Sequence, residues 1–161
     1  MKAKQVIAAL AVLVLAGGGW YLVRAHIRAT ALAGSAQDRP KPHRALPPHG
    51  GAAVVLGDEQ FQLELVRDPA AGTLKVYVLD GELEDFVRIG AKVMELQVQR
   101  PGRSETLKLL PVADAATGET VGDTCLFQTQ ADWLKQVDHF HGTIKSLAIQ
   151  DQTFKSVPFE L

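Results

Sequence analysis

Cysteine is nearly absent from this chain, because Cys125 is the only one among 161 residues. No disulfide can form within the chain, so its fold must depend on a hydrophobic core. We interpret Cys125 as a small, buried hydrophobic residue on a strand. The alternative is a nucleophilic thiol, which needs a nearby histidine or cation to lower its pKa, and the neighbouring sequence supplies neither.

Motifs of the common catalytic classes are also missing. The sequence contains no Gly-x-Ser-x-Gly elbow, no Ser-x-x-Lys pair and no glycine-rich phosphate loop that opens a helix. The run Gly17-Gly18-Gly19 lies within an apolar stretch and does not have the setting of a phosphate loop. These absences predict a protein that is not an enzyme.

Acidic residues are almost absent from the first fifty positions. Residues 1–50 hold seven Lys or Arg and a single acid, Asp38, whereas residues 51–161 hold ten Lys or Arg against seventeen Asp or Glu. This asymmetry predicts two different environments along the chain. The acidic second part argues against nucleic acid as a partner, because phosphate binding needs clustered Lys and Arg on the folded surface.

The N-terminal segment, residues 1–28, predicts a transmembrane signal anchor with basic flanks. Residues 5–23 are uncharged, and nineteen residues of helix span about 28 Å, close to the roughly 30 Å of a bilayer core. Trp20 and Tyr21 stand at the far end, where aromatic side chains favour the headgroup level. A cleaved signal peptide is the alternative, because a basic start followed by an apolar run also fits one.

We expect a single-pass protein of the inner membrane whose C-terminal domain lies in the periplasm. A short basic tail ahead of an apolar run is typical of an export signal. The basic residues after the run oppose this orientation under the positive-inside rule, but large domains translocate largely regardless of charge.

Residues 29–50 predict a flexible linker. This segment contains four prolines, several alanines and scattered basic residues, and it shows no apolar periodicity. Its basic charge favours contact with anionic headgroups. A simple solvated tether is the plainer interpretation.

Residues 51–161 predict a small all-β domain of seven or eight short strands. Apolar and polar residues alternate along most of these segments, and turn residues separate them. The expected strands are 52–56, 60–67, 73–80, 92–99, 105–110, 124–128, 142–150 and 153–159. This pattern is typical of a small antiparallel β-sandwich of the Ig-like kind. One helical turn capped by Asp132 is expected before the last two strands, and Pro158 predicts that the final strand lies at a sheet edge.

Three histidines suggest a metal site. His139 and His141 share a face if their segment is extended, and His49 lies in a turn at the start of the domain. Imidazole nitrogens suit copper or zinc, and Asp138 could add an oxygen ligand. The spacing matches no established metal motif, so ordinary loop histidines are the simpler interpretation.

Three strings resemble an HGG-type β-domain of uncharacterised bacterial envelope proteins: Pro48-His49-Gly50-Gly51, Glu64-Leu65-Val66 and Val76-Tyr77-Val78-Leu79-Asp80. A similar segment lies beside some periplasmic adaptor subunits of metal-efflux systems. The resemblance covers residues 48–160, and its specific part is the first three strands. It implies an extracytoplasmic β-domain with a link to metal handling.

These features predict a membrane-anchored, extracytoplasmic β-sandwich that acts as a non-catalytic binding or interaction module in the cell envelope. The expected partners are the membrane, through the N-terminal helix, and an envelope protein or efflux component. The alternative is a periplasmic metal-binding accessory protein that uses His49, His139 and His141.

Overall fold

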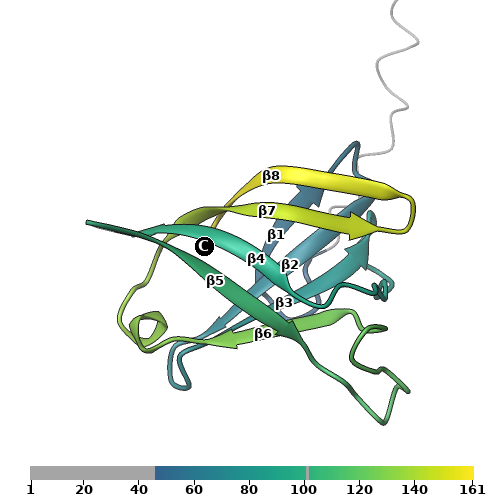
Figure 1. Ribbon diagram of the computed structural model, residues 1–161, viewed down its shortest axis with the longest axis horizontal. Coiled ribbons are helices and arrows are strands. Elements are labelled where there is room, and N and C mark those ends of the chain that lie inside the picture. Colours follow the sequence, from purple (N-terminus) through teal and green to yellow (C-terminus); the bar gives the residue numbers. More distant parts are fainter. Residues whose placement is uncertain (1–45, 101) are drawn as a thin grey trace, which may run out of the picture. The chain divides into compact units, whose positions relative to one another are not determined.

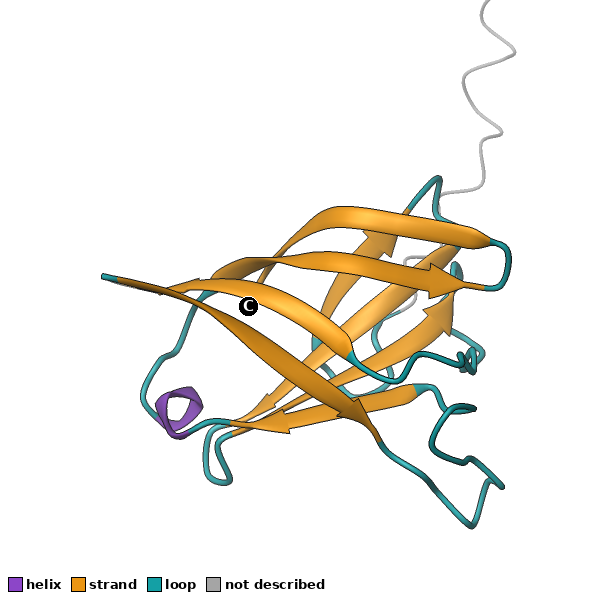
Figure 2. Ribbon diagram, in the orientation of Figure 1, coloured by secondary structure: helices purple, strands orange, loops and turns teal. Residues whose placement is uncertain are grey.

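The computed structural model describes residues 46–100 and 102–161, which form eight strands and one short 3-10 helix (Figure 1; Figure 2). The predicted anchor and the predicted linker up to residue 45 lie outside the described residues. Within the described part of the chain, no helix is long and apolar enough to cross a membrane.

The strands fall where alternation predicts them. They are β1 (Ala52–Leu56), β2 (Phe61–Asp68), β3 (Thr73–Asp80), β4 (Met94–Arg100), β5 (Arg103–Pro111), β6 (Leu126–Gln130), β7 (His141–Ile149) and β8 (Gln152–Glu160), with the helix η1 at Asp132–Lys135. Each overlaps one predicted segment, so the all-β prediction is confirmed. The predicted cap is wrong: Ala131 occupies the N-cap position, and Asp132 instead bonds Lys135 within the helix.

The eight strands pair antiparallel in one continuous order, β1-β2-β3-β6-β5-β4-β7-β8. The sheet curls until its two edge strands, β1 and β8, lie near each other, which gives a nearly closed, barrel-like sheet (Figure 1). An Ig-like sandwich would hold two stacked sheets. Here β6 pairs with both β3 and β5, which joins the two halves of the domain into a single sheet. Pro158 lies on the edge strand β8, as predicted.

The core lies inside the curled sheet. Val76 of β3 is fully buried between Leu65 of β2 and Phe127 of β6, its direct cross-strand neighbours. Alternating apolar residues of β2, β3 and β4 face this core, and all of them are buried: Phe61, Leu63, Leu65; Leu74, Val76, Val78; Met94, Leu96, Val98. Their removal from water is the main driving force for folding a domain without disulfides.

The outer face of β3 is covered as well. Leu79 alternates with the inward-facing Val78 and is nevertheless fully buried, although it lies outside the main core cluster. The chain after β3 turns back and runs beside the end of that strand, where Phe86 forms an antiparallel bridge with Leu79. The end of β3 at Leu79 is therefore covered on both faces.

Candidate functional site

A cluster of aromatic rings lies on the outer face of β2 and β3. Glu64 and Tyr77 are direct cross-strand neighbours there, and both alternate with core side chains and so point outward. The imidazole of His49 stacks on Tyr77, with ring centroids 4.0 Å apart and an interplanar angle of 10°. Phe86 tilts toward both rings, at 5.8 Å from His49 and 6.0 Å from Tyr77. We name the three rings of His49, Tyr77 and Phe86 the His49 surface.

A tight turn brings His49 onto this face. The Gly50 N–H donates to the Pro47 carbonyl oxygen at 3.0 Å. Proline at the second position and glycine at the fourth are type I preferences, and Gly50 has a φ of +70°. Gly51 then packs directly on β2, because a Cβ at this position would lie 2.4 Å from the Leu65 carbonyl oxygen. Only glycine permits such a close approach.

The Glu64 carboxyl group holds the turn in place. Its Oε1 accepts the N–H of His49 at 2.7 Å and the N–H of Gly51 at 2.9 Å, and its Oε2 lies 2.7 Å from Nδ1 of His49. The Glu64 side chain is fully buried, whereas that of His49 is 37% exposed. As a carboxylate Glu64 can only accept, so Nδ1 carries the hydrogen and Nε2 stays outside this pair.

Tyr77 is a poor acid in this setting. Burial raises the pKa of its phenol above the ordinary value of 10.0, and the charge of Glu64 raises it further. The phenol therefore stays neutral at physiological pH. The His49 surface thus combines the apolar ring of Phe86 with two rings, His49 and Tyr77, that carry polar groups.

The loops beside the His49 surface carry negative charge. Five exposed acids lie in the turn after β1 and in the loop after β3: Asp58, Glu59, Glu82, Glu84 and Asp85. Between residues 46 and 161, Pro101 excepted, none of the five forms a salt bridge. The two loops pack against each other, because a Cβ at Gly81 would lie 1.8 Å from the Glu59 carbonyl oxygen. This end of the domain therefore carries unpaired negative charge.

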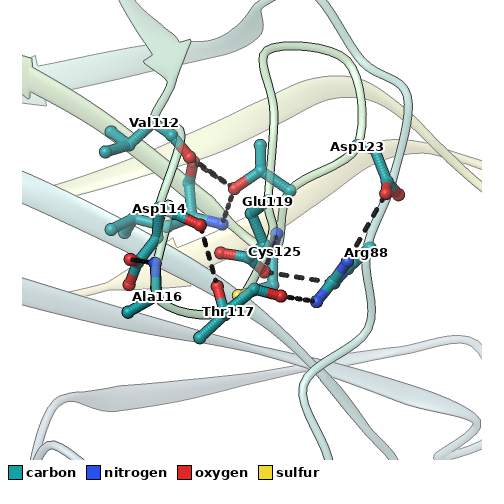
Figure 3. Close-up of polar contacts among 10 residues, drawn as sticks. Arg88, Val112, Asp114, Ala116, Thr117, Glu119, Asp123 and Cys125 are labelled. Atoms are coloured by element: carbon teal, nitrogen blue, oxygen red, sulfur yellow. Dashed lines mark hydrogen bonds and ion pairs between the residues drawn. The ribbon is translucent and has the colours of Figure 1, made fainter.

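A second polar cluster braces the long loop between β5 and β6 (Figure 3). The Arg88 guanidinium lies 3.6 Å from Glu119 and 3.5 Å from Asp123, and it donates to the Thr117 carbonyl oxygen at 2.6 Å. Glu119 is almost buried and accepts the N–H of Cys125 at 3.2 Å. These charges are used in fixing the loop, so we assign the cluster a structural role.

The Cys125 thiol is buried, as predicted, and directly precedes β6. Burial raises its pKa to about 12, and the hydrogen bond and charge of Glu119 act in the same direction. At neutral pH the group is a thiol, whereas nucleophilic attack needs the thiolate.

The other two candidate histidines lie on other parts of the sheet. His141 begins β7, where it pairs with Gln99 and Glu160, and its Nε2 lies 3.3 Å from Gln99 Oε1. His139 is exposed in the loop before β7. Over residues 46–100 and 102–161, no three His, Cys, Asp or Glu side chains are placed to hold a metal ion. The structure therefore does not bring His49 together with His139 and His141, and the copper or zinc site gains no support.

Glu64 is the site residue that sequence reasoning missed. Alternation along β2 places it on the outer face, where a solvated carboxylate is the ordinary expectation. The available signal lies in the resemblance strings, which contain His49, Gly51, Glu64 and Tyr77. The structure brings these four residues into one contact cluster.

No protein family, curated protein or solved structure matches this chain. The resemblance to envelope β-domains stays a prediction, and function has to be argued from the geometry of the His49 surface.

Proposed function

We propose that this protein is a membrane-anchored, extracytoplasmic binding module without catalytic activity of its own. The uncharged stretch of residues 5–23, with Lys4 before it and Arg24 after it, supports a single helix in the inner membrane. The short basic tail supports export, which would place the domain in the periplasm. Binding is favoured over catalysis because the polar groups of both described clusters are engaged in structural contacts.

The His49 surface is the observation that carries this proposal. Its three rings lie in contact outside the main core, and the Phe86 side chain is 46% exposed. The imidazole of His49 is fixed from two sides, by Glu64 and by Tyr77. In this closed arrangement the three rings are already placed, so a partner that binds it does not have to order their side chains. Rigid aromatic side chains with polar tips are typical of binding hot spots.

A partner with basic side chains fits this surface best. Guanidinium and ammonium groups stack favourably on aromatic faces. The unpaired acids of the two neighbouring loops would steer a cationic segment toward the rings and penalise an anionic one. The partner we propose is an envelope protein that presents an Arg- or Lys-containing segment, such as the efflux component that the sequence resemblance implies.

Site-specific photo-cross-linking in membranes tests the proposal on the full-length protein. A benzoylphenylalanine replaces Phe86 in one variant and Asp151, an exposed residue of the β7–β8 turn, in the other. We expect one envelope protein to cross-link from position 86 and not from position 151. His49→Ala should reduce that adduct several-fold, and His141→Ala should leave it unchanged. Equal adducts from both positions, or an adduct indifferent to His49→Ala, would contradict the proposal.

A further inference from the structure

Residues 46–51 form a strap across the outer face of β2. Outside the strand ladders, three hydrogen bonds tie the strap to the rest of the described domain. They start from the N–H and Nδ1 of His49 and from the N–H of Gly51, and all three end on Glu64. One side chain therefore accepts all three of these hydrogen bonds, and the stacking of the His49 imidazole on Tyr77 adds a further contact.

Apart from Glu64 and the stacking on Tyr77, the strap has little buried contact with the domain. Leu46 is 84% exposed, and residues 48–50 are exposed as well. Segments with few buried contacts and few protecting hydrogen bonds open locally, well below the free energy of global unfolding. The inward side chains Leu63 and Leu65 stay in the core whether or not the strap is in place, so its opening need not disturb the fold.

We infer that the strap opens and closes as a unit, with Glu64 as its latch, and that this movement switches the His49 surface between two states. In the closed state the imidazole covers Tyr77 and completes the three-ring surface. In the open state His49 leaves, and a bare phenol lies beside an unpartnered carboxyl group. A partner that binds only the closed surface shifts the population toward it. The partner's role rests on the proposed function, whereas the opening itself does not.

Native-state hydrogen exchange tests the opening without any substitution. A fragment of residues 44–161 suits this experiment, because this part of the chain forms one compact unit. We expect the amides of His49 and Gly51 to exchange through an opening that low urea concentrations do not change. They should exchange at least tenfold faster than the Val78 amide, which donates to the Cys125 carbonyl oxygen within the sheet. If both strap amides exchange only by global unfolding, the inference is overturned.

Two substitutions should weaken the contact between the strap and Glu64, one on β2 and one in the strap. Glu64→Ala removes the acceptor, and Gly51→Ala places a Cβ against β2 while leaving Glu64 intact. Each should speed exchange of the backbone amides at positions 49 and 51 by at least tenfold. The matched controls are Glu105→Ala, which removes a carboxylate bonded to Arg100, and Gly90→Ala, whose Cβ would meet nothing closer than 3.3 Å. Neither control should change strap exchange.

Tyr77 provides an independent readout, because it is the only tyrosine of residues 44–161. In Gly51→Ala the raised pKa of its phenol should fall back toward 10.0, since the covering imidazole is gone. In Glu64→Ala it should fall further, because the charge of Glu64 is removed as well. A Tyr77 titration unchanged in two folded variants would overturn the inference. If the variants do not fold, hydrogen exchange in the unsubstituted fragment decides.

The latch and the proposed function fail in different experiments. Strap opening in hydrogen exchange without any cross-link from position 86 would reject the binding module and keep the latch. A specific cross-link from position 86 with no strap opening would reject the latch and keep the binding module.

Discussion

At the residue scale, the Cys125 thiol keeps its proton over an unusually wide pH range. Its pKa is raised to about 12 from an ordinary 9.0, chiefly by burial. Since only the thiolate is alkylated, iodoacetamide at pH 8 should react roughly a thousandfold more slowly with the folded fragment than with the chain unfolded in urea. The native rate should keep rising above pH 9, where the unfolded rate levels off. Mass spectrometry follows both, and native and unfolded rates within tenfold of each other would contradict the raised pKa.

Glu64 shows what a single residue's sequence context does and does not reveal. Its outward direction follows from alternation with Leu63 and Leu65, which face the core. Its burial depends on His49 and Gly51, which lie fifteen and thirteen residues earlier in the chain. Alternation tells which face a side chain occupies and not what covers that face. The sequence pointed to His49 only as a metal ligand, and its contact with Glu64 did not follow from alternation.

At the scale of elements, the β7–β8 hairpin contains a correctable strain. Ile149 pairs with Gln152, so the turn consists of Gln150 and Asp151. Gln150 has a φ of 54°, and Asp151 is not among the residues with positive φ. A positive φ at the first turn position alone is the type II′ pattern, which favours glycine there. Gln150→Gly should raise the free energy of unfolding by about 1 kcal/mol.

Urea unfolding at equilibrium measures this gain. Asp151→Gly is the matched control, because glycine brings no relief at a position whose φ is not positive and adds freedom to the unfolded chain. A stability gain that is equal in the two variants would mean that the strain is not at Gln150.

Strand positions and strand order are encoded differently. The bounds of β1 and β3 match the prediction to the residue, because local alternation and flanking turn residues determine them. The place of β6 between β3 and β5 depends on pairings between distant segments. Local alternation is the same whether an apolar face lines one curled sheet or one of two stacked sheets. The sequence therefore predicted the strands and not the barrel-like closure.

At the scale of the whole molecule, the sheet has two edge strands, and each has features that limit pairing with strands of other molecules. β8 contains Pro158, which has no N–H to donate, and Ser156 at a φ of 53°. β1 is only five residues long, and it lies near β8 at the seam of the sheet. Short, interrupted and mutually covered edges limit edge-to-edge association. These features disfavour the pairing of another chain with either sheet edge.

The last prediction concerns where the whole chain resides. Residues 5–23 carry no charge, and the folded domain carries an excess of acids, so we expect the intact chain to stay in the membrane pellet after a carbonate wash. An alkaline phosphatase fused after Leu161 should be active, and a reporter that fluoresces only in the cytoplasm should stay dark. Replacing Leu13 and Leu15 by Arg should release the chain from the pellet, because two charges near the bilayer centre cost several kcal/mol. Cleavage by signal peptidase would leave a mature N-terminus near Gly17 or Gly34, and such a terminus would refute the anchor. An inactive phosphatase would refute the extracytoplasmic assignment.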